Sequence, residues 1–161
     1  MRTLEVLACA AITAAALTAA AAPQEEPFDA CAVFTQAEAA TALGTEAQPE
    51  PVNPRARRPR IVTTCTYTGT RDGKPVAASA QFRFGKTEQE ARGAFEDARL
   101  QYQTKPMLLA AGMEAFWSGK TGQMHVRKGR TWLIVSVGGA KPAERELEPA
   151  KKLAEILARK V

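Results

Sequence analysis

The chain of 161 residues contains 22 Lys or Arg, 17 Asp or Glu and 1 His, which gives a formal net charge of +5. The single histidine excludes metal sites built from several histidines, and it leaves one possible base for a histidine-dependent hydrolase. The length is sufficient for one domain with its own hydrophobic core.

Residues 1–22 predict a secretory signal peptide. An uncharged, Ala-rich run extends from Val6 to Ala22 behind a weakly positive start, and it ends in small residues, as a cleavage site requires. The run is too short and too weakly apolar for a membrane anchor. Cys9 precedes most of the run, whereas a lipoprotein cysteine follows it. We therefore expect a periplasmic or secreted protein with no transmembrane segment after cleavage.

Cleavage of the signal peptide leaves two cysteines, Cys31 and Cys65. An even number of cysteines in an oxidising compartment favours a disulfide. A metal site or a redox dithiol is not supported, because no suitable Cys-x-x-Cys spacing or neighbouring histidine is present. We predict a structural Cys31–Cys65 bridge in a single domain over residues 31–161, preceded by a flexible leader at 23–30.

The first predicted element of the domain is a short helix over residues 36–43. Thr35 and Glu38 form a capping-box pattern at its start, and Gly44 is suited to the left-handed position that ends a helix. Residues 45–60 contain four prolines, which exclude a helix or a central strand. We expect a long loop there, with at most a brief edge strand.

Two strands with alternating apolar residues are predicted next, over residues 61–67 and 76–84. Asp72-Gly73 between them is typical of a hairpin turn. The second strand should have one buried face and one solvent-exposed face. A second capping box over Thr87–Glu90 then begins an amphipathic helix at about 88–103.

The C-terminal part predicts three strands at hairpin spacing, around 114–118, 122–128 and 131–138. The third is apolar on both faces and should be central in the sheet. An amphipathic pattern from Leu147 onward predicts a last helix, which Pro149 either opens or kinks. The order α-β-β-α-β-β-β-α predicts an α+β fold with helices packed on an antiparallel sheet.

One charge cluster is prominent in the Pro-rich loop, and it consists of Arg55, Arg57, Arg58 and Arg60. It follows a stretch, residues 25–50, that carries six acidic residues and no basic one. The guanidinium groups suit an anion-binding surface for an envelope component or an acidic protein face. The alternative is a solvated loop held open by its own charge. Nucleic acid is not favoured, because the chain is exported and the cluster lacks interleaved aromatic residues.

No catalytic, cofactor or metal site is predicted from the sequence. His125 alternates with Met124 and Val126 in a predicted strand, so we expect it to face solvent together with Gln123 and Arg127. It is the one candidate base for a hydrolase, and a lone residue of this kind is weak support for catalysis. The acidic residues of the predicted helices lie on their solvated faces.

Several motifs between residues 29 and 160 resemble those of a known family: Cys31-Ala32-Val33-Phe34-Thr35, Glu38-Ala39-Ala40, Leu43-Gly44, Cys65-Thr66-Tyr67, Gly112-Met113-Glu114-Ala115-Phe116-Trp117, and Val126-Arg127-Lys128-Gly129 with Leu133-Ile134-Val135-Ser136-Val137. Together they resemble the small secreted bacterial proteins grouped as domain of unknown function 3558. The resemblance implies an extracytoplasmic, disulfide-bridged α+β domain, often tethered by lipid. That family has no assigned reaction, so only Cys31 and Cys65 carry over, as a disulfide.

The leading hypothesis is a non-enzymatic periplasmic or secreted module that binds an envelope protein or an anionic envelope component. A second is a carrier of a small apolar ligand, with a cavity between the sheet and the helices. That cavity would be lined by Met107, Leu108, Leu109, Trp117 and Trp132. An apolar pocket there would favour the carrier, and a solid core would contradict it. A hydrolase that uses His125 is the third hypothesis, and no cofactor is expected.

Overall fold

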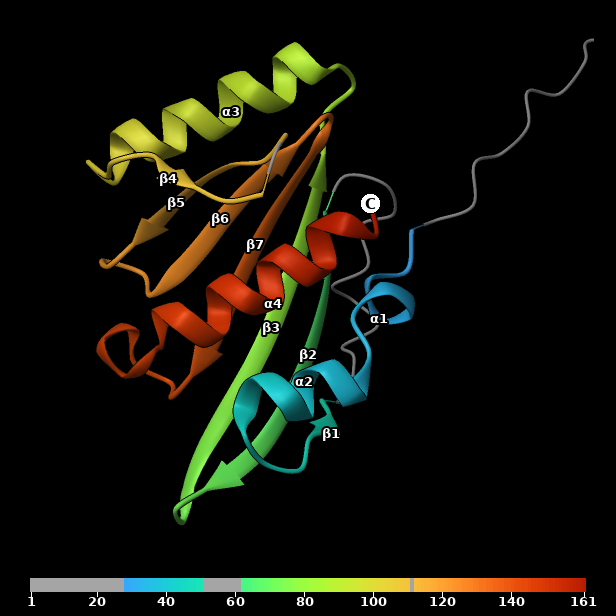
Figure 1. The fold of residues 1–161 in the computed structure, drawn as a ribbon, viewed down its shortest axis with the longest axis vertical. Helices are drawn as coiled ribbons and strands as arrows, with labels where there is room; N and C mark the ends of the chain where they lie inside the picture. The colour runs from blue at the N-terminus through green and yellow to red at the C-terminus, as the bar shows by residue number, and fades with distance from the viewer. Residues whose placement is uncertain (1–27, 51–61, 111) are drawn as a thin grey trace, which may run out of the picture.

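A computed structural model describes residues 28–50, 62–110 and 112–161 (Figure 1). In these residues the helices are α1 (Ala30–Val33), α2 (Gln36–Leu43), α3 (Glu88–Gln101) and α4 (Leu147–Arg159), with a 3₁₀ helix η2 (Pro142–Glu144). The strands are β1 (Gln48–Pro49), β2 (Val62–Arg71), β3 (Lys74–Phe84), β4 (Met107–Leu108), β5 (Glu114–Ser118), β6 (Gln123–Lys128) and β7 (Thr131–Gly138).

These strands form one sheet in the order β1-β2-β3-β7-β6-β5-β4, and all neighbouring pairs are antiparallel. The predicted α+β fold is therefore confirmed, and α1, β1 and β4 are added to the predicted order. β7 lies in the middle of the sheet, as its two apolar faces predict. Leu133, Val135 and Val137 of β7 belong to the main core, whereas Trp132 and Ile134 belong to a second cluster on the opposite face.

Different helices cover the two faces of the sheet. α4 packs on β6 and β7, and α1 and α2 pack on β2 and β3, so these three helices enclose the main core. α3 packs mainly on β6 and β7 from the opposite face, through Phe95. Figure 1 shows α4 (red) lying across the sheet with α2 (cyan) beside it. As a result, β6 and β7 are buried on both faces.

Local sequence signals set the starts of α2 and α3 as predicted. The Thr35 hydroxyl accepts a hydrogen bond from the Glu38 N–H at 3.4 Å, and the Glu38 carboxylate accepts one from the Thr35 N–H at 3.0 Å. The Thr87 hydroxyl accepts the Glu90 N–H at 3.1 Å, but the Glu90 carboxylate accepts the N–H of Lys86 at 2.8 Å, so only half of the predicted second capping box forms. Both capping interactions satisfy N–H groups that have no partner within the helix.

The β2–β3 hairpin turns at Asp72-Gly73, as predicted. The φ angles of Asp72 and Gly73 are 51° and 73°, so both central residues are left-handed. This geometry matches the right-handed twist of the flanking strands, and it explains why Asp-Gly stands there. The predicted buried face of β3 is confirmed by the residues Val76, Ala78, Ala80 and Phe82.

The helix α1 was not predicted from the sequence. The Asp29 carboxylate caps it by accepting the Cys31 N–H at 2.9 Å. Phe28, which the prediction placed in the leader, packs against Phe82 and Phe84 with ring centroids 5.0 and 4.8 Å away. The packed part of the chain therefore includes the last residues of the predicted leader.

Gly69 of β2 packs against the segment that follows α2. A Cβ atom added there would lie 2.6 Å from the Glu46 carbonyl oxygen and 3.0 Å from Thr45 Cγ2. We expect Gly69→Ala to lower the free energy of unfolding by about 2 kcal/mol, because the backbone must shift. The matched control is Gly93→Ala on exposed α3, where nothing lies within 4 Å. It should raise the free energy by up to about 1 kcal/mol. Chemical denaturation measures both, and equal changes would contradict the expectation.

Candidate functional site

A concave surface lies between α2 and α4, the two helices that Figure 1 shows side by side. Its volume is about 390 Å³. It is lined on α2 by Ala37, Glu38, Thr41 and Ala42, and on α4 by Glu148, Pro149, Lys152, Leu153 and Ile156. We call this surface the α2–α4 groove. Its volume falls in the range of ligand-binding clefts, about 300–1,000 Å³.

Small side chains on α2 leave the groove open. Ala37 and Thr41 lie one turn apart on α2, with Ala42 beside them. The Thr41 hydroxyl donates to the Ala37 carbonyl at 2.9 Å, so its hydrogen bond is made within the helix. On α4, Leu153 is buried, whereas Ile156 is 41 % exposed. The groove therefore presents mainly aliphatic surface.

The α4 side of the groove carries charges of both signs at its rim. Glu148 and Lys152 are exposed and lie one helical turn apart. Pro149, between them, occupies the first turn of α4, where its missing N–H costs no helical hydrogen bond. Of the two predicted roles of Pro149, opening the helix is the one observed.

An ion pair joins α2 to the end of α4. Lys160 Nζ lies 2.7 Å from the Glu38 carboxylate and also donates to the Val33 carbonyl at 2.8 Å. Partial burial raises the pKa of Glu38, but hydrogen bonds from Lys160 and Thr35 outweigh this effect and hold the pKa below its usual value. Glu38 is thus an ionised, partnered group at the groove, and it fixes the spacing of the two helices.

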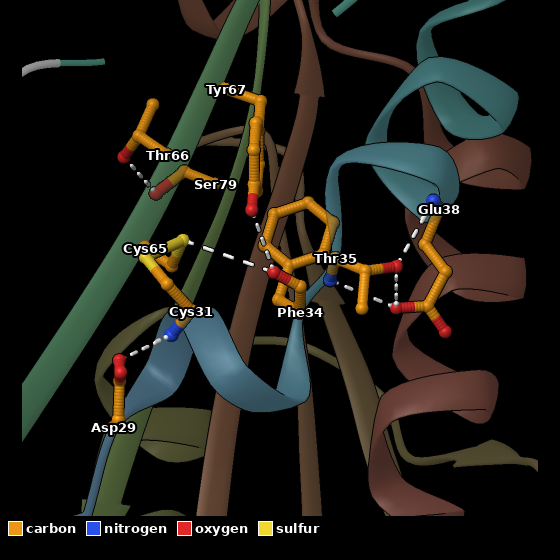
Figure 2. The surroundings of a disulfide bond; sticks show 9 residues. All are labelled: Asp29, Cys31, Phe34, Thr35, Glu38, Cys65, Thr66, Tyr67 and Ser79. Atoms are coloured by element: carbon orange, nitrogen blue, oxygen red, sulfur yellow. Dashed lines mark hydrogen bonds between the residues drawn. A yellow bond between two sulfur atoms is a disulfide. The ribbon is translucent and has the colours of Figure 1, made fainter. Parts of the chain in front are cut away.

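The Cys31–Cys65 disulfide attaches α1 to β2, as Figure 2 shows. The predicted bridge is confirmed, with a Cα–Cα distance of 5.1 Å. Beside it the Tyr67 hydroxyl donates to the Phe34 carbonyl at 3.1 Å, and burial raises the pKa of Tyr67, so the phenol remains a donor at neutral pH. Phe34 leads directly into α2. The bridge therefore anchors the segment that positions one wall of the groove.

The predicted arginine cluster, Arg55, Arg57, Arg58 and Arg60, lies outside the described residues. Its role in anion or partner binding stays a prediction.

The predicted surface position of His125 is wrong. Its side chain is 2 % exposed and stacks on Phe116, with ring centroids 4.3 Å apart and planes 11° apart. Tyr102, at the end of α3, lies 5.6 Å from it. Burial, and to a lesser extent the charge of Arg83, lowers the pKa of His125 to about 4. The ring is therefore neutral at pH 7 and lies beneath α3.

Arg127 is also buried, at 3 % exposure, although the sequence predicts it on the same solvent-exposed face as His125. Its Nε donates to Glu114 at 2.6 Å, and its Nη1 lies 3.3 Å from Glu88 of α3. The hydrogen bond from Arg127 lowers the pKa of Glu114. Alternation in β6 grouped the two side chains correctly on one face. The face is buried because α3 packs over it.

The five residues predicted to line a ligand cavity do not lie on one surface. Met107, Leu109 and Trp117 pack against the main core, whereas Trp132 belongs to the cluster under α3 on the opposite face. Leu108 lies in the edge strand β4. A single cavity between sheet and helices that includes both tryptophans is therefore wrong.

No family model, curated protein or solved structure matches this chain. The resemblance to domain of unknown function 3558 stays a prediction. Within residues 28–50, 62–110 and 112–161, no helix has the length and apolar character needed to cross a bilayer. The same residues contain no group of three or more His, Cys, Asp or Glu side chains that could hold a metal ion.

Proposed function

We propose that the protein is a periplasmic or secreted, non-enzymatic module that binds an amphipathic helix of a partner protein in the α2–α4 groove. The signal-peptide pattern supports export, and the Cys31–Cys65 bridge is compatible with a non-cytoplasmic location. The observation that carries the proposal is the groove itself, a hollow of about 390 Å³ between two helices with an aliphatic lining and a charged rim.

The shape of the groove favours a protein segment over an engulfed small ligand. Small-molecule sites bury about 70–90 % of their ligand. This groove is lined by only two helices, and Ile156 at its edge is 41 % exposed. Grooves of this kind accept the aliphatic face of a partner helix, whose flanking charges meet the rim. Here Glu148 and Lys152 provide both signs for such pairing.

The hydrolase hypothesis is not favoured by the position of its candidate base. A general base must come within hydrogen-bond reach of the substrate. His125 is 2 % exposed, its ring stacks on Phe116 beneath α3, and its pKa of about 4 makes it a weak base.

Site-specific photo-crosslinking tests the proposed groove. We place benzoylphenylalanine at Glu148 on the groove rim, or at exposed Asp97 on α3, and irradiate the native envelope fraction. We expect a discrete adduct from position 148 only. Ile156→Glu should remove this adduct, because it puts a charge at the aliphatic edge. A helical peptide from the captured partner should bind the Ile156→Glu protein at least about tenfold more weakly than the unmodified protein.

Leu100→Glu is the matched control, because among the described residues Leu100 is the other large hydrophobic residue that is exposed, at 62 %, and it lies on α3. This variant should keep the adduct and the peptide affinity. An adduct that survives Ile156→Glu, or that Leu100→Glu removes equally, would contradict binding in the groove.

A further inference from the structure

The face of the sheet opposite the α2–α4 groove has a polar area over β2 and β3. α3 covers mainly β6 and β7 on this face. Gln81 of β3 pairs with Ile134 of β7 and with Thr64 of β2, which places all three side chains on the face that α3 shares. Thr64 is exposed, and Thr66, Ser79 and Gln81 are partly exposed. This part of the sheet therefore presents hydroxyl and amide groups.

Arg83 lies at the border between this polar area and the cluster under α3. It is paired in register with Trp132, and its guanidinium carbon lies 4.9 Å from the centre of the tryptophan ring. This distance is within the range of a cation–π interaction, which favours a position of the guanidinium over the ring. Arg83 Nε is buried and has no hydrogen-bond partner. The contact with Trp132, and not a hydrogen bond to Nε, therefore positions the Arg83 side chain.

Four arginines of the described residues form no ion pair, namely Arg83, Arg130, Arg145 and Arg159, and Arg83 is the one of these whose guanidinium lies over an aromatic ring. An ion pair with a glutamate is formed by each of Arg71, Arg92, Arg99 and Arg127. No carboxylate of the described residues lies within ion-pair distance of Arg83. A partly buried guanidinium with no carboxylate partner among the described residues is suited to a carboxylate from outside, because its planar fork can donate two parallel hydrogen bonds.

The polar side chains further along the same face suit the hydroxyl groups of adjacent sugar units. The Thr66 hydroxyl donates to the Ser79 hydroxyl at 3.2 Å, and the Gln81 amide nitrogen lies 3.4 Å from the Thr64 hydroxyl. Hydroxyl groups retain further donor and acceptor capacity when they make one such bond. Sugar hydroxyls likewise donate and accept. Thr64 is exposed, and Thr66, Ser79 and Gln81 are partly exposed, so a polymer can contact these side chains.

We propose that this surface, formed by Thr64, Thr66, Ser79, Gln81 and Arg83, binds an acidic polysaccharide that carries carboxylate groups. Arg83 pairs with a carboxylate, and the hydroxyl and amide side chains bond to the hydroxyls of adjacent sugar units. The site lies on the opposite face of the sheet from the α2–α4 groove, so it is independent of the proposed partner helix.

Calorimetric titration of the purified protein with polygalacturonate at about 0.15 M salt tests the proposal. We expect saturable binding to this polymer and none to uncharged dextran. Arg83→Gln should weaken binding at least about tenfold. The matched control is Arg159→Gln, which removes the same charge from an exposed position at the end of α4. It should leave the affinity within about twofold of the unmodified protein.

Two further variants separate specific recognition from general charge attraction. Arg83→Lys keeps the charge but loses the planar fork, and it should weaken binding severalfold. Thr64→Val keeps the shape and the charge and should also weaken binding, and it decides the question if Arg83→Gln does not fold. The proposal would be overturned if polygalacturonate did not bind, or if Arg159→Gln lowered the affinity as much as Arg83→Gln does. It would also be overturned if polyphosphate bound more tightly than polygalacturonate and Thr64→Val left the polyphosphate affinity unchanged.

Discussion

Replacing Cys31 and Cys65 together with alanine is expected to lower the free energy of unfolding by about 3–4 kcal/mol. The bridge joins residues 34 positions apart, and without it the unfolded chain gains the conformational entropy of that loop. The double replacement avoids an unpaired thiol. α1 should be the first element to be lost, because a four-residue helix is too short to form without tertiary support.

Guanidinium denaturation of the two proteins, with and without a thiol reductant, measures this effect. The reductant should bring the unmodified protein to the stability of the double variant and leave the variant unchanged. A loss below about 1 kcal/mol would mean that the unfolded chain stays compact when the bridge is absent. A reductant effect on the variant itself would contradict the assignment of the effect to this bridge.

Acidification from pH 7 to pH 4 is expected to cost about 3 kcal/mol of stability through His125 alone. The folded protein holds the pKa of His125 at about 4, below the ordinary value of 6.5. The unfolded chain therefore binds the proton first as the pH falls. The free energy of unfolding that the neutral His125 contributes is fully present above pH 6.5 and is lost progressively between pH 6.5 and pH 4. Its cause is burial, and the positive charge of Arg83 adds to it.

His125→Phe removes the titration and keeps an aromatic ring next to Phe116. Between pH 7 and pH 4 the free energy of unfolding of this variant should fall by about 3 kcal/mol less than that of the unmodified protein. Proton NMR gives a direct measurement, because the chain contains a single histidine. An imidazole signal that titrates near pH 6.5 would show that the ring is hydrated or partnered, and it would contradict the expectation.

The position of His125 shows how far alternation along one strand can be interpreted. The pattern of β6 correctly placed His125 and Arg127 on the face opposite Met124 and Val126. It could not show that this face is covered. A signal was present in the next strand, because His125 pairs with Ile134 of β7, which is apolar on both faces. Extending the apolar face of β7 to its neighbour would have predicted a buried histidine.

Capping residues, strand alternation, the Asp-Gly turn and the two cysteines that follow the predicted signal peptide were sufficient to predict α2, α3, the β2–β3 hairpin, a central β7 and the disulfide. The helix starts and the turn depend on residues close in sequence, and the disulfide prediction depends on the expected export to an oxidising compartment. The sequence alone is therefore sufficient to predict them. α1 was missed because four residues carry no periodic signal, and its helix depends on the bridge and on the Asp29 cap.

The α2–α4 groove and the Arg83 surface were decided by the tertiary structure. The groove exists because small residues of α2, such as Ala37 and Thr41, meet a helix more than a hundred positions later in the chain. Arg83 is distinctive because folding places its guanidinium over the Trp132 ring. Local sequence patterns report which face a residue shares, and only the packing of distant elements determines what covers that face and which charges remain without a partner.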